Sequence, residues 1–107
     1  MKCILSGLDI HKDDASTEHL VPKSRVPQRI WNNPQNLFKA HYILNSIKSD
    51  FLPCEFEEEK YNLAFYALNH WKLDPKNRNF IEQAIQNWQD GYKPNWCNLC
   101  LLKCKQR

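Results

Sequence analysis

Beyond residue 39, apolar residues recur at spacings of three and four, which is typical of amphipathic helices. The first such stretch predicts a helix over residues 40–50, with an apolar face made by Ala40, Ile43, Leu44, Ile47 and Phe51. The next two predict helices with the stripes Tyr61, Ala64, Phe65, Leu68, Trp71 and Ile81, Ala84, Ile85, Trp88. Asp74-Pro75 is a typical helix start and Gly91 a typical stop. The acidic run 55–59 suits the first turns of a helix, where negative charge complements the dipole.

The first forty residues lack this helical period. Residues 17–21 alternate weakly and carry Leu20 and Val21, which predicts a short strand, and residues 37–38 predict a second one. Pro22 and Pro27 disfavour helix between them. Residues 1–15 are expected to be loop and turn. The pattern predicts an α+β fold in which a small β unit precedes three or four helices, within a single domain over residues 1–107.

Composition narrows the classes of protein. Hydrophobic residues make up 42% of the 107, and no apolar run approaches the roughly 20 residues that a membrane span needs. Charges appear early, at Lys2, Asp9 and Lys12, unlike a secretory signal, so we expect a cytoplasmic protein. The five cysteines are then free thiols or metal ligands rather than disulfides. A net charge of +3 permits a nucleic-acid partner without requiring one.

Groups suited to phosphodiester hydrolysis occur in three blocks. Glu18-His19 is followed by Pro22, and Asn36 precedes Leu37. His41, Asn45 and Lys48 share one stripe of the predicted helix, although an ordinary solvated face would look the same. A histidine is suited to remove a proton from water near pH 7. Carboxylate and amide oxygens suit Mg²⁺, which needs few protein ligands because it retains water.

These blocks resemble the HNH, or ββα-metal, nuclease family. That motif has an acidic residue and a histidine followed by proline, a central Asn-Leu-like pair, and a helix bearing His or Asn and then Lys. The spacing from Asn36 to Asn45 and on to 48–50 is similar to the HNH domain of RNA-guided DNA-cutting enzymes. The match covers about residues 3–52, so residues 53–107 form a helical extension of the ββα-metal core.

The resemblance implies a role for each motif residue. His19 would be the general base and Asn36 would brace the loop that orients it. Glu18 and Asn45 would bind Mg²⁺ or Mn²⁺, and Lys48 would lie near phosphate. The family cuts DNA and leaves a 5′-phosphate. Glu18 stands where Asp is commoner, which puts the choice of metal in doubt.

Lys23, Arg25 and Arg29 cluster between the two predicted strands. A basic loop there would grip the DNA backbone, because phosphate contacts supply most non-specific affinity. A solvated loop is the alternative. The four tryptophans are interpreted as packing residues rather than base-stacking platforms.

A structural Zn²⁺ is a further hypothesis. Many relatives hold zinc with two Cys-x-x-Cys pairs, but here the corresponding segments read Cys3-Ile-Leu-Ser6 and His41-Tyr-Ile-Leu44, so two ligands are lost. Replacements would come from Cys97, Cys100 and Cys104, with Cys3 or Cys54 as the fourth. Residues 97, 100 and 104 also share one helical face, and buried free cysteines are common.

Two other functions stay open at this stage. A non-catalytic nucleic-acid-binding module could keep the HNH shape, although such a protein would usually have lost His19 or Asn45. A nuclease subunit could instead act only as a homodimer or within a larger assembly, because cutting both strands needs a second site or a partner.

Overall fold

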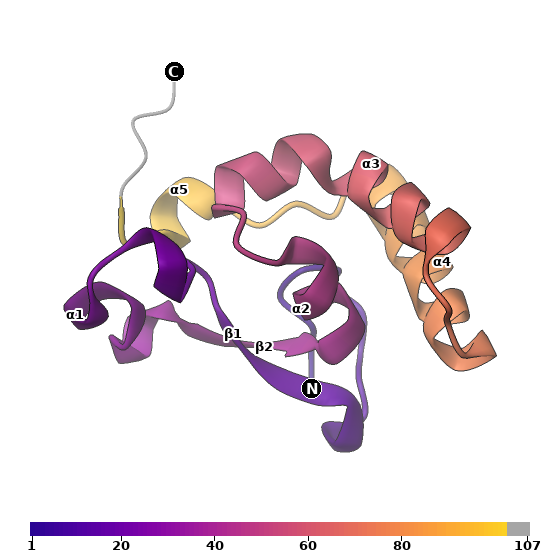
Figure 1. Ribbon diagram of the computed structural model, residues 1–107, viewed down its shortest axis with the longest axis horizontal. Coiled ribbons are helices and arrows are strands. Elements are labelled where there is room, and N and C mark those ends of the chain that lie inside the picture. Colours follow the sequence, from indigo (N-terminus) through magenta and orange to yellow (C-terminus); the bar gives the residue numbers. More distant parts are fainter. Residues whose placement is uncertain (103–107) are drawn as a thin grey trace.

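The computed structural model describes residues 1–102 as a mixed α+β domain with a two-stranded sheet and several helices (Figure 1). The strands and α-helices are β1 (Ala15–His19), α1 (Gln28–Trp31), β2 (Leu37–His41), α2 (Tyr42–Lys48), α3 (Pro53–His70), α4 (Pro75–Gln89) and α5 (Trp96–Leu99). The short 3-10 helices within residues 1–102 are η1 (Lys12–Asp14), η2 (Lys23–Arg25) and η3 (Pro34–Asn36). No helix within the described residues is long and apolar enough to cross a membrane.

The two strands form an antiparallel hairpin with a long connection. Ala15 pairs with His41 at one end and His19 with Leu37 at the other. Side chains alternate between the faces of a strand, so Ser16 and Glu18 share one face of β1 while Thr17 and His19 share the other. Glu18 is buried, whereas Thr17 is exposed and His19 is half-buried. The face of β1 that carries Ser16 and Glu18 is therefore the one packed against the rest of the domain.

Helix α2 is the centre of the domain, because it contacts β1, β2, α3 and α4. Figure 1 shows α2 between the hairpin and the long helix α3. Its apolar side buries Ile43, Leu44 and Ile47 in the common core. The side chain of His41 caps the helix, with Nδ1 accepting a hydrogen bond from the Ile43 amide at 3.1 Å.

Helix α4 and the segment after it hold the N-terminal turn. The carbonyl of Leu5 accepts from Trp88 Nε1 at 2.8 Å, and the carbonyl of Ile4 accepts from the Tyr92 hydroxyl at 2.7 Å. Gly7 has φ +76°, and a Cβ built there would lie 2.5 Å from the Tyr92 ring. A side chain at residue 7 would thus meet both backbone strain and a steric clash.

Most expected elements are confirmed, with shifted ends. The predicted strands become β1 and β2, and the helix expected over residues 40–50 is shorter because His41 is still the last residue of β2. Residues 96–99 form a short helix, in the segment where Cys97 and Cys100 were predicted as zinc ligands. The short α1 was missed because Pro22 and Pro27 disfavour helix, but Pro27 only precedes it as the N-cap residue.

His41 gives the first testable prediction. Its ring is stacked between Tyr42 and Phe80, with centroids 4.8 and 4.0 Å away. Burial lowers the pKa of His41, while nearby Asp14 raises it and Lys76 lowers it. Below pH 6.5, His41 therefore binds a proton more readily in the unfolded chain than in the folded one, so the free energy of unfolding falls as the pH drops.

We expect His41→Asn, which keeps a capping oxygen, to lose part of this pH dependence. The measurement is the urea midpoint at pH 7.5 and 5.5, with the exposed His70→Asn as control. An unchanged difference between the two pH values in His41→Asn would contradict the assignment.

Candidate functional site

Glu18 and Lys48 form a buried ion pair between β1 and α2. Lys48 Nζ lies 2.7 Å from Glu18 Oε2, and the side chains are 0% and 2% exposed. Neither atom has a further hydrogen-bond partner among the described residues. Burial raises the pKa of Glu18, and the ammonium of Lys48 acts in the opposite direction. Lys48 was predicted to lie near a bound phosphate; the structure places its ammonium against the carboxylate of Glu18, which needs a counter-charge because it is buried.

Asn45 bridges the same two elements one turn before Lys48. Its Nδ2 donates to Ser16 Oγ at 2.9 Å and to the Thr17 carbonyl at 3.1 Å. The side-chain carbonyl of Asn45 makes no hydrogen bond within residues 1–102 and remains an acceptor for a ligand. Because Ser16 and Glu18 share a face of β1, the structure brings Asn45 and Glu18 to the same junction of strand and helix.

His19 ends β1 on the other face of the strand. Its ring meets Trp31 edge-on, with centroids 5.7 Å apart. Lys23 Nζ lies 4.8 Å from the centroid of the Trp31 ring. Partial burial lowers the pKa of His19, and the positive charges of Lys23 and Lys48 lower it further. The imidazole is therefore neutral at pH 7 and able to accept a proton.

Asn36 fixes the connection that returns from β1 to β2. Its Oδ1 accepts from the Val21 amide at 2.8 Å, and its Nδ2 donates to the carbonyls of Val21 and Trp31 at 3.1 and 3.0 Å. The Leu20 amide donates to the Asn36 carbonyl at 2.9 Å. Asn36 is fully buried, so these hydrogen bonds fix the backbone of Val21, two residues after His19. They also fix the carbonyl of Trp31, whose ring contacts the ring of His19.

The basic residues of this connection divide into two kinds. Arg25 is tied to α3, because its guanidinium donates to both oxygens of Glu55 at 2.9 and 3.2 Å and to the Asp50 carbonyl at 3.2 Å. Its predicted role in binding DNA is therefore not favoured. Lys23 and Arg29 are exposed, and neither has an ion-pair partner among residues 1–102. Of the four predicted phosphate contacts, these two remain available.

The predicted zinc ligands are not assembled in the described part of the chain. There, no group of three or more His, Cys, Asp or Glu side chains could hold a metal ion. Cys3 is buried, and its Sγ accepts from the His41 amide at 3.4 Å. Cys100 is buried and Cys97 is exposed, both at α5. Cys104 lies outside the described residues. Hydrogen bonds from Trp88 and Tyr92 hold the N-terminal turn that follows Cys3.

Sequence reasoning missed the contact of Trp31 with His19. Tryptophan was interpreted as packing, and the spacing of residues 19 and 31 has no regular period. A weak indication was available, because Lys23 and Trp31 both lie in the segment between the two halves of the motif.

The buried pair gives a second prediction. Lys48→Met leaves a carboxylate buried without its counter-charge, and Glu18→Leu leaves an ammonium, so each should lower the free energy of unfolding by about 3–5 kcal/mol. The double variant should recover most of the loss, because two apolar side chains need no counter-charge. Urea denaturation measures all three. Lys2→Met is the control, since its ion pair with Asp9 is exposed on both sides and should matter little. Additive losses in the double variant would exclude direct coupling.

Comparisons with known proteins do not assign this chain to a family. A search of protein-family models found no match, and neither did searches of curated proteins and of solved structures. The candidate functional residues therefore rest on the sequence motif and on the geometry of the chain itself.

Proposed function

We propose that the protein is a DNA endonuclease of the HNH type. The observation that carries the proposal is that the carboxylate of Glu18 and the free amide carbonyl of Asn45 lie at the junction of β1 and α2, while the imidazole of His19 ends the same strand on its other face. Their order along the chain is that of the HNH motif, and Asn36 fixes the backbone beside them.

His19 would act as the general base. Its neutral ring accepts a proton from a water that attacks the phosphorus of a phosphodiester, and the bond from phosphorus to the leaving oxygen breaks. Trp31 restricts the ring from one side, and the hydrogen bonds of Asn36 keep the end of β1 in place. Lys23 and Arg29 are positioned on the exposed connection to bind neighbouring phosphates.

A divalent cation would be held by Glu18 and Asn45. Their oxygen donors fit Mg²⁺ or Mn²⁺ in chemistry, and Oε2 of Glu18 is a buried oxygen whose one partner among the described residues is the ammonium of Lys48. Such an ion would stabilise the negative charge that develops on the leaving oxygen. Oε2 of Glu18 faces the ammonium of Lys48, so the ion pair and the metal would share one carboxylate.

A nuclease subunit of a larger assembly is the second candidate. Helix α3 exposes Phe65 and Tyr66, which are 46% and 58% accessible, and Trp71 just beyond it is 37% accessible. Exposed aromatic residues in one region are typical of protein interfaces. A partner there would leave the hairpin free for DNA.

Removal of the base is the third prediction. His19→Ala should slow nicking of supercoiled plasmid in Mg²⁺ by at least about 100-fold, because general-base catalysis contributes that much or more. Binding of duplex DNA should persist, since it rests on other side chains. His11→Ala, in an exposed turn, is the matched control and should cut at the wild-type rate. Cleavage by His19→Ala at the wild-type rate would show that the assigned base is wrong.

The metal gives the fourth prediction. Excess EDTA should stop cleavage, and Mg²⁺ or Mn²⁺ should restore it. Asn45→Ala should weaken binding of Mn²⁺, measured by electron paramagnetic resonance, whereas Ser46→Ala on the exposed side of α2 should not. Full activity in excess chelator would refute the metal-dependent reaction.

A further inference from the structure

The register of the hairpin places a further cation on the face that carries His19. Thr17 of β1 pairs with Lys39 of β2. Two residues further along β1, His19 pairs with Leu37, so both pairs project from the same face of the sheet. His19 is half-buried there, and the other three residues are exposed. This face is therefore open to a ligand, whereas Glu18 is buried on the opposite one.

Lys39 lies diagonally across the hairpin from His19. Residues in this relation in an antiparallel pair are about 7–8 Å apart, which long side chains can span. The ammonium of Lys39 makes no hydrogen bond or ion pair within residues 1–102, so it is available to a ligand. A group bound by Lys39 would thus be an immediate neighbour of the atoms on which His19 acts.

A hollow of about 280 Å³ on the hairpin is lined by Thr17, Leu37, Phe38 and Lys39. Its lining carries one positive charge and no carboxylate. The Thr17 hydroxyl makes no hydrogen bond within the described part of the chain, so it adds a second donor. Phosphate oxygens only accept hydrogen bonds, and an ammonium beside a hydroxyl suits them.

The cations identified earlier lie towards the other end of the hairpin. Lys23 follows the end of β1, and its Nζ lies 4.8 Å from the centroid of the Trp31 ring, which contacts His19. Arg29 belongs to α1, which Figure 1 shows at the end of the hairpin where β2 begins. Lys39 therefore extends the row of positive charge past His19 in the opposite direction.

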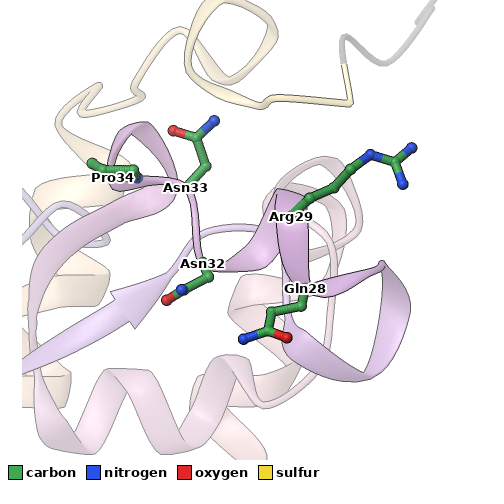
Figure 2. A pocket seen from close by; sticks show the side chains of 5 residues that line it. All are labelled: Gln28, Arg29, Asn32, Asn33 and Pro34. Carbon is green, nitrogen blue, oxygen red and sulfur yellow. The ribbon is translucent and has the colours of Figure 1, made fainter.

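Arg29 also borders a polar pocket of about 510 Å³ around α1, which is lined by Gln28, Arg29, Asn32, Asn33 and Pro34. Figure 2 shows its side chain directed away from the amides of Gln28 and Asn32. The guanidinium is therefore placed to meet a phosphate outside this pocket, in line with the role proposed for it above.

We propose that Lys39, with the Thr17 hydroxyl, binds a DNA phosphate next to the scissile one, on the side of His19 away from Lys23. The substrate strand then runs along the exposed face of the hairpin. The inference rests on the proposed nuclease function, which it deepens by naming the path of the DNA and a phosphate contact that the motif does not include.

The salt dependence of binding tests the contact without requiring cleavage. A fluorescein-labelled duplex is titrated with His19→Ala protein in EDTA at several NaCl concentrations, and fluorescence anisotropy gives the affinity. Adding Lys39→Gln should lower the slope of log affinity against log salt by about 0.9, the value for one phosphate contact. Lys39→Arg should keep the slope. Lys72→Gln removes the same charge from the exposed segment between α3 and α4 and should also keep it. An unchanged slope in Lys39→Gln would overturn the proposal.

Kinetics locate the contact relative to the reacting phosphate. In protein with an intact His19, Lys39→Gln should raise KM for nicking about threefold to fivefold with little change in kcat, because an exposed charge contact that persists throughout the reaction contributes equally to substrate and transition state. A fall in kcat at unchanged KM would overturn the assignment, since it would place Lys39 at the scissile phosphate itself.

The two measurements separate this proposal from the function beneath it. Nicking by the wild type, with slope and KM unchanged in Lys39→Gln, would refute the contact and leave the nuclease intact. A slope lowered by Lys39→Gln but not by Lys72→Gln, in a protein that never cuts, would refute the nuclease and leave the hairpin face as a DNA-binding surface. Absence of both binding and cutting would refute both.

Discussion

A carboxylate and an ammonium lie 2.7 Å apart between β1 and α2, and both side chains are almost completely buried. Each charge stabilises the other, because an unpaired charge buried in this position would lower the free energy of unfolding by several kcal/mol. The pair also specifies the register of the hairpin. A slip of one residue would turn Glu18 to the opposite face and leave Lys48 alone in the core. The arrangement of strand and helix that forms the candidate site therefore depends on this contact.

The same contact shapes the chemistry of the site. Glu18 is at once the counter-charge of Lys48 and the proposed metal ligand, so the two roles would compete for its oxygens. Asn45 carries no such conflict, because its Nδ2 binds β1 while its carbonyl stays free. His19 lies on the other face of the strand, where burial and two cations lower its pKa and keep its ring neutral.

Hydrogen bonds to the backbone supply the remaining rigidity. Asn36 binds the connection after β1 at Val21 and at Trp31, and Trp88 and Tyr92 bind the N-terminal turn from the far end of the chain. Both sets satisfy backbone groups that no strand or helix satisfies. The helical extension therefore stabilises the N-terminal half as well as covering its core.

The sequence by itself determined the longer helices, the approximate strands and the residue types of the site. Periods of two and 3.6 identify which residues face a core, and Ile43, Leu44 and Ile47 do so as expected. It also predicted that Glu18 and Asn45 belong together, which the contact of α2 with β1 makes possible.

Only the tertiary structure decided where the long charged side chains end. Lys48 and Arg25 were both expected at a phosphate, yet one turns inward to Glu18 and the other reaches Glu55 on α3. Their partners lie 30 residues away in the chain, and no local period encodes such a distance. The contact of Trp31 with His19 and the polar pocket around α1 have the same origin. Both are set by how the connection between β1 and β2 folds back over the hairpin, and that path depends on the buried hydrogen bonds of Asn36.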